Sequence, residues 1–170
     1  MRFRSEEPAD RQDIHRLTMR AFADPDSEKE PGEAALLAEL YECEGYLPEY
    51  SVVAEIGGRV VGHAIATRGW LDGDIPLLGL GPLSVDPAHQ RRGVGVGLMA
   101  EIRDRAARDG ERAIVLLGHI EYYNRLGYEP AIPNGIIPSD PSWGEYFMVL
   151  NLSEMPLPKG NFRYAEPFGV

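Results

Sequence analysis

The sequence predicts one mixed α/β domain spanning residues 1–170. Its length and its 44% hydrophobic and 26% charged residues are ordinary for a single compact domain. Short β-branched runs alternate with segments whose apolar residues recur at helical spacing, so both strands and helices are expected. Gly57 and Gly58 join two of the β-branched runs and supply the positive φ of a tight turn, which predicts an antiparallel hairpin.

The first third of the chain is expected to contain two helices. Ile14, Leu17 and Phe22 recur near helical spacing after the opening segment at 8–10, and Leu36 and Leu40 mark a second helical face. In chain order we expect a strand at 3–6, a helix ending near 22, a loop at 24–31, a helix at 32–44, and hairpin strands at 51–56 and 59–67.

The apolar run at 75–85 predicts a long strand that is interrupted by Gly79, Gly81 and Pro82. Because proline cannot donate a hydrogen bond to a neighbouring strand, we expect a bulge here, or a parting from one neighbour near the end of the strand. The remaining elements are expected to be a helix at 94–108, a strand at 112–117, a short helix at 120–126, a strand at 146–152 and an irregular tail from Met155.

The charge balance disfavours some classes of partner. Seventeen basic and 27 acidic residues give a formal net charge of −10, which opposes general binding to a phosphate backbone and attracts cationic amines or basic peptides. The chain has one cysteine, Cys43, a charged segment at 1–10 and no run of 18 apolar residues. We therefore expect a soluble, cytoplasmic protein with no nucleic-acid or membrane partner.

The segment from Leu83 to Leu98 carries the strongest chemical signal. A predicted strand leads through Arg91 and Arg92 into the start of a helix that contains Gly93, Gly95 and Gly97. Free N–H groups at a helix start, the positive end of its dipole and a backbone without side chains can hold phosphate oxygens. Glycine weakens a helix by about 1 kcal/mol relative to alanine, so these glycines indicate a function for the site.

Other phosphate and hydrolase motifs do not match. There is no Walker lysine, the third glycine of the dinucleotide fingerprint is missing, and no Gly-x-Ser-x-Gly elbow surrounds Ser84. The histidines lack the spacing of a zinc protease, so we expect no metal.

Two ordered motifs give the chain its likeness to a known family. Gln90-Arg91-Arg92-Gly93-Val94-Gly95 resembles the Gln/Arg-x-x-Gly-x-Gly/Ala signature of the GCN5-related N-acetyltransferase (GNAT) family, and the segment Tyr122–Tyr128 resembles its Tyr-x-x-x-Gly-Phe motif. The resemblance covers residues 52–128. It implies a central, largely antiparallel sheet with helices on both faces and a cofactor cleft where two neighbouring strands part.

The resemblance also implies a site for acetyl-CoA. Its pyrophosphate would lie on the N–H groups of Arg92 to Gly97, its pantetheine arm would run beside the strand at 83–85, and Pro82 would lie at the bulge. The implied cofactor-binding residues are Leu83, Val85, Gln90, Arg91, Arg92, Gly93, Val94, Gly95, Val96 and Gly97. The chain departs from the family at Leu116–His119, where members often carry an asparagine, and at Tyr128, which replaces phenylalanine.

Two groups are implied to be catalytic. The N–H of Val85 would stabilise the oxyanion that forms when an amine attacks the thioester. Tyr123, four residues before Gly127, would protonate the departing thiolate, with Tyr122 mainly a packing residue. An alkylammonium acceptor must also lose a proton, and His63, His119, Glu121 and Glu49 stay open as acceptors of that proton. Cys43, flanked by Glu42 and Glu44, is interpreted as a packing residue.

The expected function is direct transfer of acetyl from acetyl-CoA to a primary amine in a ternary complex, without a metal. A small cationic amine is slightly favoured as acceptor, and a protein N-terminus or lysine is the alternative. A CoA-binding sensor or interaction module without catalysis stays open as a different class. Oligomeric state, including a homodimer, is left open.

Overall fold

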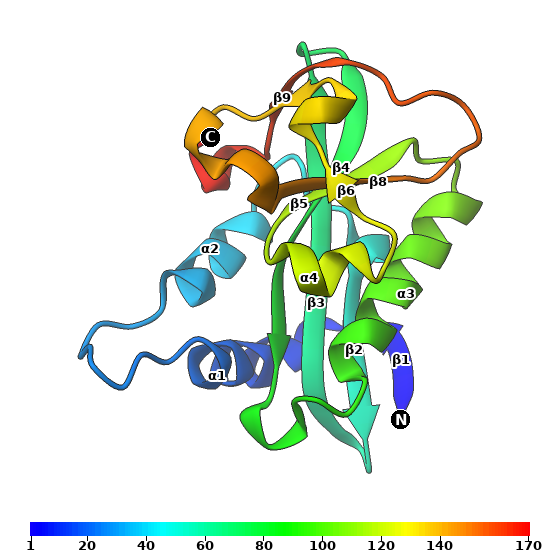
Figure 1. Ribbon diagram of the computed structural model, residues 1–170. Coiled ribbons are helices and arrows are strands. Elements are labelled where there is room, and N and C mark those ends of the chain that lie inside the picture. The colour runs from blue at the N-terminus through cyan, green and yellow to red at the C-terminus, as the bar shows by residue number, and fades with distance from the viewer.

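The computed structural model describes residues 1–170 and has one large sheet with helices on both faces (Figure 1). The sheet follows the order β1-β2-β3-β4-β5-β8-β6, with β9 paired to β3 and to β7. All neighbouring strands are antiparallel except β4 with β5 and β7 with β9. The predicted mixed α/β, largely antiparallel fold is confirmed.

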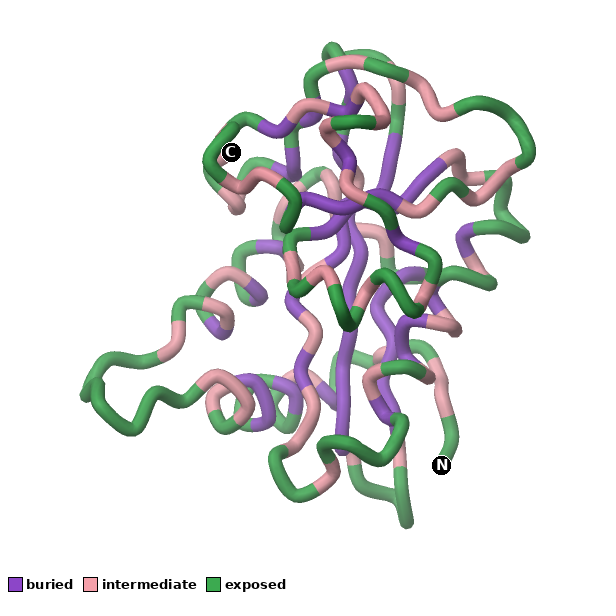
Figure 2. Tube along the Cα trace, viewed as in Figure 1, coloured by how far each residue is buried: buried purple, intermediate pink, exposed green.

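The N-terminal half forms a regular meander. Its elements are β1 (Arg2–Ser5), α1 (Arg11–Ala21), α2 (Gly32–Leu40), β2 (Ser51–Ile56), β3 (Arg59–Leu71) and β4 (Ile75–Val85). Gly57 and Gly58 both have positive φ, as the predicted hairpin requires. Helices α1 and α2 cover one face of the sheet, and their loop at 22–31 projects into solvent (Figures 1 and 2).

The C-terminal half is built from shorter elements. They are α3 (Val94–Arg108), β5 (Ala113–Leu117), α4 (Ile120–Asn124), β6 (Glu129–Pro130), β7 (Ile136–Ile137), β8 (Phe147–Asn151) and β9 (Gly160–Arg163). Helix α3 packs on the face opposite α1 (Figure 1), where Leu98, Ile102 and Ala106 are fully buried. The 3.6-residue spacing of these side chains explains why this helix was predicted with correct ends.

Some predicted bounds are wrong. The helix predicted at 32–44 ends at Leu40, because short turns such as Cys43 N–H to Leu40 C=O replace it. The helix predicted at 120–126 ends at Asn124, and the strand predicted at 59–67 continues to Leu71.

The tail from Met155 is not wholly irregular. Its residues 160–163 form β9, which pairs with Trp70 and Leu71 at the end of β3. This pairing joins segments about 90 residues apart, so no local sequence pattern could predict it.

None of the helices is both long and apolar enough to cross a membrane.

Candidate active site

The strands β4 and β5 part after two residue pairs. They are joined only at Leu78–Ile114 and Gly79–Val115, whereas β4 stays paired with β3 as far as Val85. Between Leu80 and Leu83, two residues of β4, Gly81 and Pro82, face the single β3 residue between Ala64 and Ala66. This confirms both the bulge and the parting that the glycines and the proline predicted.

The parting leaves backbone groups of β4 without a strand partner. The N–H of Asp86 donates to the Val61 carbonyl of β3 at 2.9 Å. Because backbone direction alternates along an antiparallel strand, Ser84 also faces β3, while the N–H groups of Leu83 and Val85 face the gap. The Val85 carbonyl accepts a bond from the Gln90 side-chain amide at 3.3 Å. The gap thus has the hydrogen-bonding edge of a strand.

A cavity of about 350 Å³, here called the α3 cavity, lies at the start of α3 and reaches this edge. Along α3, the first N–H with a helical acceptor is that of Gly97, which donates to Gly93 at 3.0 Å. The four preceding residues therefore point N–H groups outward without a backbone acceptor. These residues, Gly93, Val94, Gly95 and Val96, all line the α3 cavity together with Leu83, Val85, Gln90, Arg91 and Tyr122.

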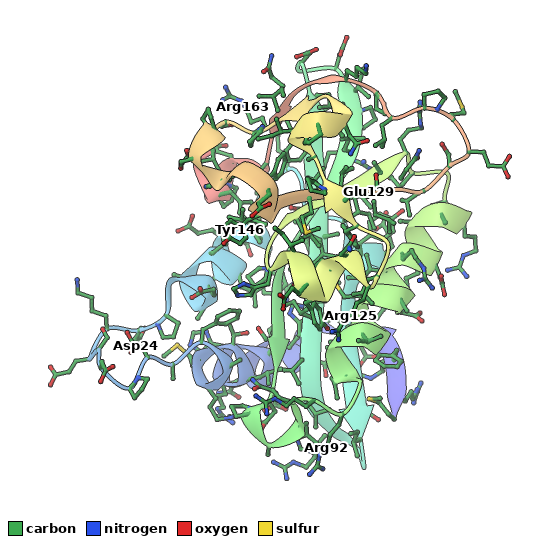
Figure 3. The ribbon with its side chains drawn as sticks, viewed as in Figure 1. Asp24, Arg92, Arg125, Glu129, Tyr146 and Arg163 are labelled. Atoms are coloured by element: carbon green, nitrogen blue, oxygen red, sulfur yellow. The ribbon has the colours of Figure 1, made fainter.

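The loop before α3 is shaped by left-handed backbone. Gly93 has φ 82° and Arg91 has φ 62°, an unusual value for a side-chain-bearing residue that costs about 1 kcal/mol or more. Arg91 lines the α3 cavity, but Arg92 does not, and Figure 3 shows Arg92 at the outer edge of the loop. No carboxylate lines this cavity, so it is a local positive region on an acidic protein.

The glycines of this segment have different roles. A Cβ on Gly95 would lie 2.9 Å from the Tyr122 hydroxyl, so its hydrogen keeps the cavity open beside that side chain. A Cβ on Gly97 would instead overlap the ring of Phe3 on β1. The N–H of Gly97 is also bonded within the helix, and Gly97 does not line the α3 cavity, so its visible contact is packing against Phe3. An approach of Gly97 to phosphate stays a prediction.

A second cavity, of about 470 Å³ and here called the cleft cavity, occupies the gap between β4 and β5. It shares Phe22 and Leu83 with the α3 cavity, so the two are adjacent. One side is formed by the strands and α4, through Leu80–Leu83, Leu116–His119 and Tyr123. The rest of the lining, here called the far side, comes from the end of α1, from α2 and from the C-terminal region: Phe22, Glu33, Leu36, Trp143, Tyr164, Phe168 and Val170.

Tyr123 lies at the cleft cavity with its ring against Gly118, where a Cβ would overlap it. Its ring makes edge contacts with Tyr122 at 4.8 Å and Tyr128 at 6.0 Å between centroids. Burial, and to a lesser degree the neighbouring Tyr122, raises the pKa of Tyr123 to about 12. Its hydroxyl is therefore protonated at neutral pH and can donate to a basic group in the cleft.

The four candidate proton acceptors are placed very differently. His119 lines the cleft cavity, whereas Glu49 and Glu121 line neither cavity. His63 is fully buried beneath α1, where its Nε2 lies 2.9 Å from the Ser51 hydroxyl and 3.0 Å from Glu6.

The Glu6 carboxylate is held in its charged form in this network. Burial alone would raise the pKa of Glu6, but the bonds and charge of His63 and the bonds of Ser51 and Tyr41 lower it below its usual value. His63 is thus part of a structural network rather than of the cleft.

Sequence reasoning missed the far side of the cleft cavity. Phe22 and Leu36 were recognised only as helix-face residues, and Glu33, Trp143 and Phe168 were not singled out. Each lies in a different local context, and no motif links them. A larger cavity of about 700 Å³ adjoins at Tyr164 and includes the half-buried Cys43. No group of three His, Cys, Asp or Glu side chains is placed to hold a metal ion.

Comparison with known proteins gives consistent results. The model of the acetyltransferase (GNAT) family matches residues 11–128. Over 97% of its length the chain is 33% identical to an uncharacterised N-acetyltransferase of Escherichia coli K12, YjhQ, of which 92% is covered. The crystal structure of the E. coli GNAT protein YhbS in complex with CoA superposes with a TM-score of 0.89 and 28% identity, covering 99% of this chain and 92% of YhbS. A Brucella melitensis GNAT acetyltransferase with acetyl-CoA has a TM-score of 0.79 and 30% identity, with 98% and 97% covered.

Proposed function

We propose that this chain, which belongs to the acetyltransferase (GNAT) family and is an acetyl-CoA-dependent N-acetyltransferase, acetylates a small cationic primary amine by direct attack in a ternary complex. The observation that carries the proposal is the adjacency of the two cavities at Phe22 and Leu83. It supports one continuous path from the free N–H groups of α3, along the parted edge of β4, to the hydroxyl of Tyr123.

The residues along this path fit acetyl-CoA. The α3 cavity offers four outward N–H groups and Arg91 with no opposing carboxylate, which suits a pyrophosphate. The open edge of β4 at Leu83 and Val85 suits the amide groups of the pantetheine arm, which can bond as a strand would. Arg92 adds positive charge at the rim without lining the cavity.

We assign two roles in the transfer. The Val85 N–H, predicted to donate to the thioester oxygen, faces the gap but lines only the α3 cavity. The Leu83 N–H also faces the gap and lies where the two cavities meet, so we propose that it donates to this oxygen, where negative charge develops as the amine attacks. The raised pKa of Tyr123 keeps its proton available for the sulfur as the C–S bond breaks. The ammonium proton of the acceptor leaves before attack, and His119 is the candidate of the four that lines the cleft cavity. The balance is amine cation plus acetyl-CoA giving amide, CoA thiol and one proton.

Charge supports a cationic acceptor. The net charge is −10, and the exposed loop beside the cleft carries Asp24, Asp26, Glu28 and Glu30 against one lysine. Figure 3 shows Asp24 on this projecting loop. Such a field concentrates cations near the cleft, although salt limits its reach to about 8 Å. The single cysteine supports the cytoplasm as the proposed compartment.

The test measures thiol release from acetyl-CoA over a panel of acceptors. The panel contains alkylamines and diamines, a peptide with a free N-terminus and an N-terminally blocked lysine peptide. We expect kcat/KM to be highest for small amines. A higher value for either peptide would favour the protein-acetylating alternative, and tight acetyl-CoA binding without turnover of any amine would favour a sensor.

A further inference from the structure

The far side of the cleft cavity combines apolar side chains with an acidic one. It is formed mainly by apolar and aromatic side chains, among them Phe22, Trp143 and Phe168, and it contains one carboxylate, Glu33. The aromatic rings support one another, since Tyr164 lies 6.1 Å from Trp143 and 4.7 Å from Phe168 between ring centroids. Rings held in this way form a fixed apolar surface before any ligand arrives.

The acidic side chain, Glu33, has no hydrogen-bond or ion-pair partner within the protein. It is half-buried in the first turn of α2, and its carboxylate makes no hydrogen bond and no ion pair with another side chain. Other partly buried acids of the protein are paired, as Asp10 is with Arg4 and Glu111 with Arg68. A carboxylate beside apolar surface gains most from a cation that approaches within hydrogen-bonding distance.

We propose that the acceptor is a primary amine on an aromatic or bulky apolar body, with its ammonium group bound by Glu33 and its apolar body against Trp143 and Phe168. This inference rests on the proposed function and names its substrate class. The cavity of about 470 Å³ must also admit the thioester end of the coenzyme. The remaining space fits a small molecule, and of a protein acceptor it would admit only a terminus or one side chain.

Glu33 is a binding residue in this proposal, and the proton balance is that of the transfer itself. The ammonium group bound at Glu33 gives one proton to His119 or to water, and the neutral nitrogen then forms the C–N bond. The nitrogen releases its second proton to solvent as the amide forms. The C–S bond breaks, and the thiolate takes the Tyr123 proton. Tyr123 regains that proton from solvent.

The first experiment compares 2-phenylethylamine with ethylamine, which keeps the cation and lacks the ring. We expect kcat/KM to be at least about tenfold higher for 2-phenylethylamine, because burying a ring of this size is worth that factor or more. Glu33→Gln should raise KM for 2-phenylethylamine about tenfold while the calorimetric Kd for acetyl-CoA changes less than twofold. Glu39→Gln, on the exposed side of the same helix, is the matched control and should change neither.

A second readout does not need turnover. In a Trp70→Phe background Trp143 is the one remaining tryptophan, so its fluorescence reports occupancy of the far side. With CoA bound, 2-phenylethylamine should change this signal saturably, and Glu33→Gln should weaken that binding. The uncharged analogue 2-phenylethanol should bind at least tenfold more weakly.

The outcomes separate the two proposals. Equal kcat/KM for the two amines, or an unchanged KM in Glu33→Gln, overturns the substrate class while leaving N-acetylation of small amines intact. If no amine is acetylated but the Trp143 signal responds as expected, the binding class stands and the proposed reaction fails. If neither responds, both fail.

Discussion

The two sides of the cleft are built by different means. The coenzyme side consists mainly of one short segment, residues 83–96, and offers mainly backbone N–H groups from β4 and α3. The acceptor side consists of side chains from α1, α2 and the C-terminal region, with Phe22 and Phe168 separated by most of the chain. A site made of backbone is fixed by local conformation, whereas one made of side chains depends on long-range packing and can change by single substitutions.

The largest expected effect on the coenzyme side comes from a substitution that fills the α3 cavity. Gly95→Glu places a carboxylate among the outward N–H groups, beside the Tyr122 hydroxyl. We expect the affinity for acetyl-CoA to fall by about 100-fold or more and the ligand-induced rise in melting temperature to disappear. Ala107→Glu adds the same charge to the exposed far end of α3 and should leave both measurements unchanged. Retained binding in Gly95→Glu would show that the α3 cavity does not hold the coenzyme.

Tyr123 lines the cleft cavity, and removal of its hydroxyl should affect the rate alone. Tyr123→Phe is expected to lower kcat by about 100-fold with little change in the Kd for acetyl-CoA. Because the pKa of Tyr123 is raised to about 12, its acid form persists throughout the working range, so the ratio of wild-type to variant rates should be constant from about pH 7 to 10.

The adjacent tyrosine provides the control. Tyr122→Phe removes a half-exposed hydroxyl near Gly95 and should keep kcat within about threefold of wild type. If the two variants lose rate equally, or if Tyr123→Phe loses none, the proton-donor assignment is wrong.

A substitution at Gly97, with a smaller expected effect, tests where the coenzyme side ends along α3. Gly97→Ala should lower the free energy of unfolding by about 1–3 kcal/mol, because the new methyl group overlaps Phe3. For a chain of this size that lowers Tm by several degrees, while the affinity of the folded protein for acetyl-CoA should be unchanged. Combining it with Phe3→Leu should recover part of the loss. Weakened coenzyme binding at unaltered stability would instead indicate that Gly97 contacts the coenzyme.

The contrast between the sides also explains what the sequence could predict. The motif at 90–95 and the glycines and proline of β4 identified the α3 cavity and the parted strand, because turns and helix starts depend on neighbouring residues. Tyr123 was assigned by family resemblance, and the structure places it at the cleft. Glu33 and Trp143 could not be found, since their proximity results from how α2 and the segment before β8 pack around the sheet. For the same reason β9, which pairs with β3, was missed.

The short junction between β4 and β5 makes the cleft sensitive to distant changes. Only Leu78–Ile114 and Gly79–Val115 join the two strands, while Leu83 lies four residues beyond, about 13 Å along an extended strand. A relative tilt of about 5° at this pivot would shift Leu83 by about 1 Å, enough to misalign a nucleophile and its carbonyl. We therefore expect the packing around residues 78–79 and 114–115, which line neither cavity, to influence catalytic alignment.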